Sequence, residues 1–199
     1  VLSVLPFHGR RRARGRGYLP PAFPSADPRF TIEGMRQLVF DHRALFDYLT
    51  RLGTPGLGVM GTSLGGYGAA LLATLEARLR AGVFFIPLSA IEAYAYASGR
   101  FIGNAQEQLA QLHAMQAAHY PISPLARPPL IRGNQVVVIH GQADVITGRE
   151  HSDPLVKHFD AEVHHFLGGH VLHFGRGRAL EAMWRLLARE GFLATKDHR

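Results

Sequence analysis

The pattern of hydrophobic and polar positions predicts strands that alternate with helices along the chain. Between residues 31 and 51, apolar residues recur every three or four positions, as in a helix with one buried face: Met35, Leu38, Val39, Leu45, Phe46 and Leu49. Shorter segments predict strands at 1–5, 57–60, 81–88, 135–140 and 162–167, of which 135–140 reads as a buried, β-branched strand. Further helices are predicted at 65–80, 153–159 and 178–190. This alternation indicates an α/β fold, with a mostly parallel sheet and helices on both of its faces.

Two longer segments interrupt the alternation. Segment 8–30 is rich in Gly, Pro and Arg and predicts a long loop. Segment 89–134 is an insertion with a helical run at 105–119, and we expect it to form a small cap over the site. Its aromatic residues Tyr94, Tyr96 and Phe101 either line a substrate pocket or pack the cap onto the sheet. We predict one domain over residues 1–199, with the cap at about 89–134.

The composition is that of a single globular domain. The chain has 199 residues, of which 47% are hydrophobic, which is enough to bury a core. It contains no run of about 18 apolar residues that would predict a transmembrane helix. It has no cysteine, which excludes disulfides and thiol chemistry, and its first residues lack the layout of a signal peptide. We therefore expect a cytoplasmic enzyme of bacterial type.

Arginine dominates the net charge of +7, since Lys157 and Lys196 are the only lysines. A GC-rich genome produces this ratio, and a solvated basic surface is the simplest interpretation. One cluster is denser and would attract nucleic acid, anionic lipid or an acidic substrate: Arg10, Arg11, Arg12, Arg14 and Arg16. The cluster has no interleaved aromatic residues and no nucleic-acid-binding motif, so we expect no nucleic-acid or membrane partner. Because it follows a predicted strand end, its arginines are placed to rim an active-site mouth.

The segment Gly-Thr-Ser-Leu-Gly-Gly at 61–66 lies where a predicted strand turns into a predicted helix. This is the context of a G-x-S-x-G nucleophile elbow, in which a sharp turn exposes the serine hydroxyl above the sheet. We predict that Ser63 is the nucleophile, and that Gly61 and Gly65 are positions without room for a Cβ atom. The free N–H groups of a helix start favour negative charge, so the N–H of Leu64 is predicted as one donor of an oxyanion hole.

An acid and a base for this serine follow later in the chain, each in a loop after a predicted strand. Asp144 lies past the strand at 135–140, although Asp is also a common turn residue. His170 follows two glycines, whereas its rival His173 is interpreted as a packing or supporting residue. A histidine so placed takes the serine proton, and a carboxylate holds the histidine in the correct tautomer. No pair among the 12 histidines has the spacing of a helical zinc motif, so no metal is predicted.

In these motifs the chain resembles the α/β-hydrolase superfamily. The resemblance rests on GTSLGG at 61–66, GQADVITG at 141–148 and GGHVLHFG at 168–175, and it covers residues 1–192. The order of Ser63, Asp144 and His170 along the chain is that of the superfamily. Bacterial esterase-like hydrolases are the nearest likeness, because LPFH at 5–8 precedes an Arg-rich loop and a helix. The resemblance implies that a small-molecule ester with a short to medium acyl chain is hydrolysed through an acyl-enzyme, without a cofactor. Lipase, thioesterase and arylesterase activities are not separated from this one by sequence.

Compared with the superfamily, the chain lacks strands at its N-terminus. Three strands and a helix usually precede the strand that residues 1–5 resemble, so we expect a fragment or a naturally minimal form. The loop after residues 1–5 would then occupy the position of the loop that supplies the second oxyanion donor in the superfamily. We therefore predict the N–H of Arg10 or Gly9 as that donor, and His8 as a substrate contact. An exposed sheet edge at 1–5 predicts a homodimer through that edge, unless the loop at 8–30 covers it and leaves a monomer. The alternative function is a hydrolase remnant without an oxyanion hole that serves as a binding or scaffold protein, although the intact trio favours the enzyme.

Overall fold

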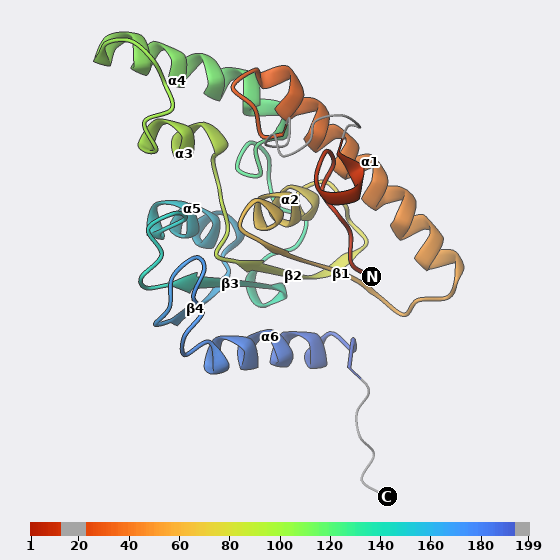
Figure 1. Cartoon of the computed structure of the whole chain (residues 1–199). Helices are drawn as coiled ribbons and strands as arrows, with labels where there is room; N and C mark the ends of the chain where they lie inside the picture. The colour runs from red at the N-terminus through yellow and green to blue at the C-terminus, as the bar shows by residue number, and fades with distance from the viewer. Residues whose placement is uncertain (13–22, 194–199) are drawn as a thin grey trace, which may run out of the picture.

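A computed structural model of the chain describes residues 1–12 and 23–193. Its centre is a parallel sheet of four strands that lie side by side in their sequence order (Figure 1). The strands are β1 (Leu57–Thr62), β2 (Leu79–Phe85), β3 (Val136–Gly141) and β4 (Glu162–Phe166). The α-helices of the described residues are α1 (Pro28–Arg51), α2 (Leu64–Ala73), α3 (Ile91–Ala97), α4 (Ala105–His119), α5 (Arg149–Phe159) and α6 (Gly177–Arg189).

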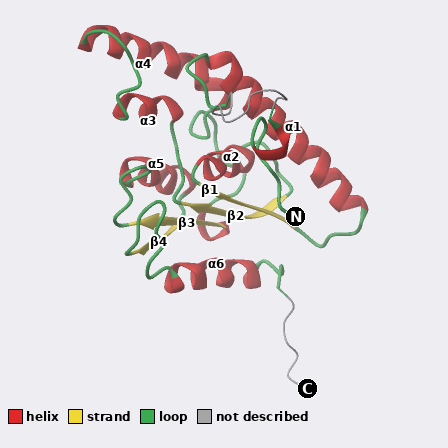
Figure 2. Cartoon of the chain, viewed as in Figure 1, coloured by secondary structure: helices red, strands yellow, loops and turns green. Residues whose placement is uncertain are grey.

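Helices cover both faces of the sheet (Figure 2), with α2 and α5 on one face and α6 on the other. Successive side chains of a strand point to opposite faces, and the core divides accordingly. In β3, Val136 and Val138 belong to the hydrophobic cluster that includes α1 and α2. Val137 and Ile139 of the same strand belong to the cluster that includes α6. The predicted α/β fold with a helix-covered parallel sheet is therefore confirmed.

Most elements begin and end close to their predicted bounds, and α2 is the clear exception. The helical run predicted at 105–119 coincides with α4, which begins with a capping box formed by Asn104 and Glu107. The helix predicted at 65–80 ends at Ala73, and β2 already begins at Leu79. The prediction of helix over residues 74–80 was therefore wrong.

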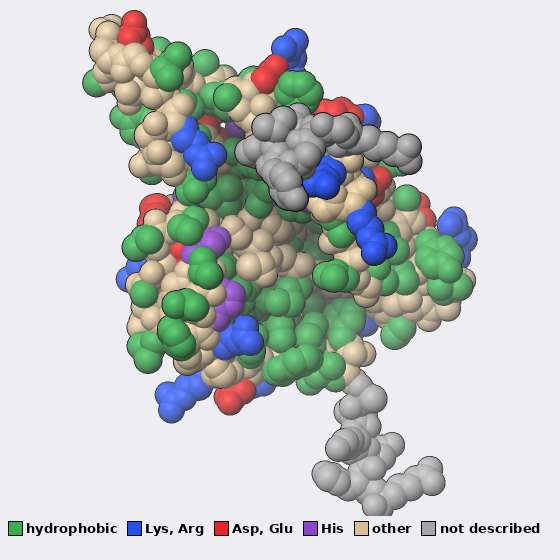
Figure 3. Space-filling view, viewed as in Figure 1, with side chains coloured by type: hydrophobic (Ala, Val, Ile, Leu, Met, Phe, Trp, Pro, Cys, Tyr) green, Lys and Arg blue, Asp and Glu red, His purple; other side chains and the backbone are tan. Residues whose placement is uncertain are grey.

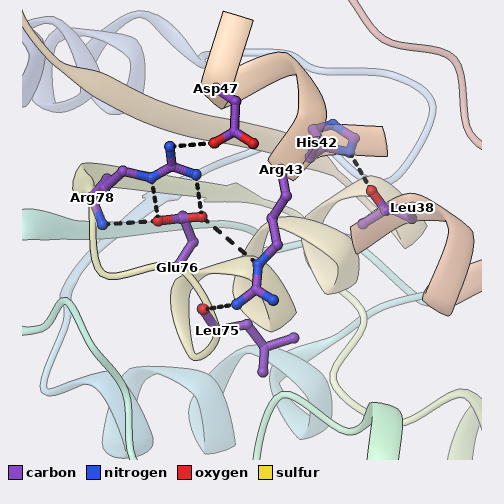
Figure 4. Close-up of polar contacts among 7 residues, drawn as sticks. All are labelled: Leu38, His42, Arg43, Asp47, Leu75, Glu76 and Arg78. Atoms are coloured by element: carbon purple, nitrogen blue, oxygen red, sulfur yellow. Dashed lines mark hydrogen bonds and ion pairs between the residues drawn. The ribbon is translucent and has the colours of Figure 1, made fainter. Parts of the chain in front are cut away.

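A network of ion pairs holds the turn between α2 and β2 (Figure 4). Glu76 is only 6% exposed and accepts hydrogen bonds from the backbone N–H of Arg78 (3.1 Å) and from its Nε (2.8 Å). The same guanidinium binds Asp47 of α1 at 2.6 Å. Arg43 of α1 lies 3.8 Å from Glu76 and donates to the carbonyl of Leu75. These contacts with α1 fix a turn where the apolar pattern alone predicted more helix, because tertiary partners override local preference.

Residues 1–5 form no strand in the structure, so that prediction was also wrong. Val1 and Leu2 are each 95% exposed. The segment is held instead through the carbonyl of Val4, which accepts a hydrogen bond from Arg11 at 2.9 Å. Among the described residues β1 is consequently an edge strand, and a cavity of about 540 Å³ lies between it, residues 1–5 and α1.

The surface carries charged and hydrophobic side chains in mixture. Figure 3 shows basic and acidic groups scattered over the visible face and hydrophobic side chains gathered between the sheet and α6. Trp184 on α6 is half exposed. Within the described residues, no helix combines the length and the hydrophobicity needed to cross a membrane.

Candidate active site

Ser63 lies at the sharp turn between β1 and α2. Its backbone has φ 55° and ψ −116°, a conformation that residues with a Cβ atom seldom adopt because of steric crowding. The N–H of Ser63 donates to the carbonyl of Phe85 at 3.0 Å. Its carbonyl accepts from the N–H groups of Tyr67 (3.1 Å) and Leu88 (3.2 Å). The turn is thus held from three directions, in the geometry that a nucleophile elbow requires.

Two glycines make this turn possible, and one of them differs from the predicted pair. A Cβ on Gly61 would overlap the carbonyl group of Gly65, so only glycine fits there. A Cβ on Gly66 would lie 2.9 Å from Cβ of Pro87. At Gly65, no described atom outside its chain neighbours and the adjoining backbone of α2 lies within 4 Å of the Cβ position. The prediction that Gly65 lacks room for a side chain was therefore wrong, because its carbonyl group makes the close approach.

The carboxylate of Asp144 and the imidazole of His170 form a hydrogen-bonded pair. Nδ1 of His170 lies 3.0 Å from Oδ2 of Asp144, and since a carboxylate oxygen only accepts, Nδ1–H is the donor. The Asp144 side chain is fully buried and that of His170 is 17% exposed. Burial raises the pKa of Asp144, but hydrogen bonds from the Thr147 N–H, from His170 and from the Ile146 N–H outweigh burial and hold this pKa below its ordinary value. An ionised Asp144 keeps the proton on Nδ1 and leaves Nε2 as the basic nitrogen.

The loop after β3 and the loop after β4 are joined through their backbones. The N–H of Gln142 donates to the carbonyl of Phe166 (2.8 Å), and the N–H of Ala143 donates to the carbonyl of Gly168 (3.2 Å). A Cβ on Gly169 would lie 2.7 Å from the carbonyl oxygen of Ala143, so the close approach depends on glycine. The acid and the base are consequently positioned as one unit.

His173 supports this unit from behind. Its Nε2 lies 3.0 Å from the carbonyl oxygen of His170. Its ring packs edge-on against Phe85 and Phe166, with ring centroids 5.2 Å and 5.6 Å apart. In the residues that the structure describes, no group of three or more His, Asp or Glu side chains is arranged to hold a metal ion.

Thr147 is a buried residue that the sequence analysis did not single out. Its Oγ1 lies 2.9 Å from the carbonyl oxygen of Ile86, 3.1 Å from Oδ2 of Asp144 and 3.1 Å from Nδ1 of His170. A hydroxyl donates once and accepts twice, so Oγ1–H donates to one of the two oxygens and Oγ1 accepts from Nδ1–H. Its N–H also donates to Oδ1 of Asp144 at 2.8 Å. Thr147 therefore braces the acid and the base against the end of β2.

Ser63 and His170 line the same cavity, which has a volume of about 440 Å³ and is suited to a small molecule. Residues of α3 and α4 form part of its wall, and the two helices are linked by a buried hydrogen bond between His119 Nδ1 and Glu92 Oε2 (3.0 Å). Both helices belong to segment 89–134. The greater part of the lining is apolar and includes Leu64, Leu88, Ile91, Ala95, Met115 and Ile146.

The predicted pocket residues divide between the lining and its surroundings. Tyr94 and Phe101 line the cavity, whereas Tyr96 does not. Tyr96 is 40% exposed and lies beside Phe101, with ring centroids 6.1 Å apart. The loop before α1 contributes Pro24, Ser25 and Ala26, which were not predicted.

The structure places His8, Gly9 and Arg10 outside this lining, contrary to prediction. Nδ1 of His8 lies 2.9 Å from the carbonyl oxygen of Pro6, and its ring packs edge-on against Phe23 at 5.8 Å. Gly9 and Arg10 belong to a short 3-10 turn, η1 (Gly9–Arg11). The physical reason is that residues 1–5 do not pair with β1, so the loop after them is not delivered to the end of the sheet. The N–H of Leu64, at the start of α2, remains beside Ser63 in the lining.

The arginine cluster is only partly described. Arg11 forms an ion pair with Asp41 of α1 at 2.5 Å, which fastens the N-terminal segment to that helix. Arg14 and Arg16 lie outside the described residues.

Comparison with known proteins shows what the chain is similar to. No family model matches it. An uncharacterized protein of Mycobacterium tuberculosis strain H37Rv, Rv2627c, is 32% identical over 178 residues, which cover 86% of this chain and 41% of the relative. The chain therefore spans about two fifths of the length of the curated relatives it matches.

Solved structures extend the comparison to the fold. The acetyl xylan esterase from Paenibacillus sp. R4 has a TM-score of 0.60 and 16% identity, over 86% of this chain and 58% of that one. Puromycin hydrolase has a TM-score of 0.57 and 20% identity, over 79% of this chain and 26% of that one. At these identities the likeness concerns the fold.

Proposed function

Since this chain has the α/β-hydrolase fold, we propose that it is a serine hydrolase that cleaves carboxylic esters of short to medium acyl length. The observation that carries the proposal is the strained turn at Ser63, which faces the same cavity as a histidine paired with a buried carboxylate. Backbone strain persists only where the surroundings enforce it, and it concentrates at functional sites. A neighbour named as an acetyl xylan esterase favours an ester as the substrate.

In the acylation step, Oγ of Ser63 attacks the carbonyl carbon of the ester while its proton passes to Nε2 of His170. The carbonyl oxygen becomes an oxyanion, and the N–H of Leu64 at the start of α2 stabilises it. As the intermediate collapses, the bond to the alcohol oxygen breaks and the alcohol leaves with the proton from His170. Asp144 keeps the imidazole oriented and stabilises its positive charge throughout.

In the deacylation step, water attacks the acyl-enzyme and gives a proton to His170. The acyl carbon forms a bond with the water oxygen, the bond to Ser63 Oγ breaks, and Ser63 recovers its proton from His170. One ester and one water thus give one acid and one alcohol. Within the described residues, Ser63 and His170 form no direct hydrogen bond, and such contacts often tighten only when substrate binds.

A panel of p-nitrophenyl esters of increasing acyl length tests the proposal. We expect release of p-nitrophenol, with kcat/KM falling once the acyl chain exceeds what a cavity of about 440 Å³ accommodates. Ser63→Ala should lower kcat by about five orders of magnitude, because the residual rate then comes from binding and the oxyanion hole alone. Ser98→Ala, at the exposed end of α3, is the matched control and should retain the wild-type rate.

A fluorophosphonate probe should label the wild-type protein and Ser98→Ala but not Ser63→Ala. Near-normal ester cleavage by a folded Ser63→Ala protein would exclude Ser63 as the nucleophile. A folded wild-type protein that neither reacts with the probe nor cleaves any ester would instead favour the remnant with a binding role.

A further inference from the structure

The cavity that contains Ser63 has an uneven charge. Arg100, just past the C-terminal end of α3, lines it. Among the described lining residues there is no Asp or Glu, and Arg100 is the only Arg or Lys. The carboxylate of Asp144 lies behind His170, is fully buried, and is already bound by Thr147, Ile146 and His170. A cavity with a cationic rim and no facing acid attracts an anion.

The guanidinium of Arg100 is exposed and has no carboxylate partner in the part of the chain that the structure describes. Its contact is with the ring of Tyr94, whose centroid lies 5.3 Å from Cζ. By contrast, Arg11 and Arg36 bind carboxylates at 2.5 Å and 2.7 Å. A cation–π contact with the ring leaves the N–H groups of the guanidinium able to donate to a further acceptor.

The backbone at the end of α3 fixes the position of Arg100. The N–H of Gly99 donates to the carbonyl of Tyr96, and the N–H of Arg100 donates to the carbonyl of Ala95, both at 3.0 Å. Gly99 has φ 64°, so these bonds form a Schellman motif. Arg100 is thereby held next to Tyr94 and Ala95, which line the cavity with it.

We propose that the ester substrate carries a carboxylate remote from the scissile bond, and that Arg100 binds this carboxylate. The inference rests on the proposed function, because it names the substrate class of the same site. A guanidinium matches a carboxylate with two parallel hydrogen bonds, and Arg100 can form them while it keeps its contact with the Tyr94 ring. Because Ile91, Phe101 and Met115 form the wall of the cavity, the part of the substrate between ester and carboxylate is apolar.

Two sets of substrates test this inference and distinguish the end of the substrate that bears the charge. In the first set the carboxylate is on the acyl side: p-nitrophenyl monoesters of adipic and suberic acid are compared with the same compounds bearing a distal carboxamide. In the second it is on the alcohol side: 4-carboxyphenyl butyrate is compared with 4-carbamoylphenyl butyrate. The carboxamide has the same shape without the charge. We expect the carboxylate to have the higher kcat/KM in at least one set, by about five-fold, which is the upper end for an exposed ion pair.

Arg100→Gln should bring this ratio down to about one. Arg51→Gln is the matched control, because Arg51 is an exposed arginine at the end of α1 that does not line the cavity, and it should keep the wild-type ratio. Raising the salt concentration from about 0.05 to about 0.5 M should reduce the ratio in the wild-type protein, since salt screens an exposed pair.

A ratio of one or less in both sets, or a ratio that Arg100→Gln leaves unchanged, would overturn the inference. If the neutral carboxamides are still cleaved in a Ser63-dependent manner, the proposed function stands without it. If none of the compounds is cleaved by the folded protein, the proposed function fails and the inference fails with it.

Discussion

Replacing Thr147 by Val tests how far the orientation of His170 depends on the uncharged hydroxyl group of Thr147, which contacts Asp144 and His170. Valine keeps the β-branched shape, and its backbone N–H still donates to Oδ1 of Asp144, a bond of 2.8 Å in the wild-type structure. The substitution removes the hydroxyl, which lies 2.9 Å from the Ile86 carbonyl oxygen and 3.1 Å from both Asp144 Oδ2 and His170 Nδ1. The change is therefore confined to one polar group in the centre of the site.

The stability effect follows from burial. Thr147 and Ile86 are each 1% exposed, and the side chain of Asp144 is fully buried. The substitution therefore removes a hydrogen bond from a buried oxygen, either the carbonyl of Ile86 or Oδ2 of Asp144. Leaving a buried acceptor unpaired costs about 1–3 kcal/mol. We expect the free energy of unfolding of Thr147→Val to fall by about 2 kcal/mol, and Tm by roughly 4–8 °C for a domain of this size.

The kinetic effect should be moderate. Asp144 still holds Nδ1 of His170 at 3.0 Å, so the correct tautomer survives the substitution. We expect kcat for p-nitrophenyl butyrate to fall by about ten-fold, which corresponds to about 1.4 kcal/mol of transition-state stabilisation. The loss should stay well short of the roughly ten-thousand-fold loss expected for Asp144→Asn, in which the tautomer itself changes. KM should change less than kcat, because the Thr147 hydroxyl contacts the proposed general base His170.

Thr147→Ser is the matched control, because it keeps the hydroxyl and loses only a methyl group. Steady-state kinetics and urea unfolding followed by circular dichroism should place its kcat within about three-fold of the wild type, with most of the stability retained. An unchanged kcat in Thr147→Val, or equal losses of kcat in the Val and Ser variants, would refute the role of the hydroxyl.

Three further predictions concern the base, the turn and the α2–β2 connection. His170→Ala should abolish ester cleavage. His173→Ala should mainly lower Tm, because His173 packs against two phenylalanine rings. An inactive but stable His173→Ala protein would instead identify His173 as the base. Gly61→Ala should prevent fluorophosphonate labelling or folding, because the added Cβ atom would overlap the carbonyl group of Gly65. Gly65→Ala should still be labelled. Equal labelling of both variants would count against the geometry of the turn at Ser63. Glu76→Gln should lower the free energy of unfolding at neutral pH by about 1–3 kcal/mol, because hydrogen bonds from the neighbouring arginine, against the effect of burial, hold the pKa of Glu76 below its ordinary value of 4.5. Since the folded-state pKa is the lower one, this contribution is complete above pH 4.5 and is lost as the pH falls through the folded-state pKa. The unfolding free energies of wild type and variant, measured as a function of pH, should therefore converge as the pH falls below 4.5, and a gap that did not narrow in acid would contradict the reasoning.

The features that the sequence predicted correctly are those encoded by short, contiguous patterns. The apolar run before residues 61–66 and the helix after them adjoin the turn directly, so the position of Ser63 between β1 and α2 followed from local order. The loops of Asp144 and His170 were predicted in the same way, each from a strand that runs into a glycine-containing turn. The structure brings these two side chains to 3.0 Å.

The features that the sequence did not reveal depend on contacts between distant segments. Thr147 owes its position to the carbonyl of Ile86, 61 residues earlier in the chain, and no local motif marks such a pair. The end of α2 is set by the ion pairs of Glu76 and Arg78 with α1. Residues 1–5 have the composition of a strand, but a strand also needs a neighbouring strand as hydrogen-bond partner, and among the described residues they pair with none.

The backbone bonds between the loops after β3 and β4 tie the acid and the base of the proposed catalytic trio together. Thr147 joins this pair to Ile86, next to Phe85, whose carbonyl accepts the N–H of Ser63. When the cavity adjusts to substrates of different size, we therefore expect the acid–base contact to stay unchanged. For protein engineering, the loop after β3 and the loop after β4 therefore have to be exchanged together. If one loop were replaced alone, the backbone hydrogen bonds between the two loops would lose their matching donors and acceptors.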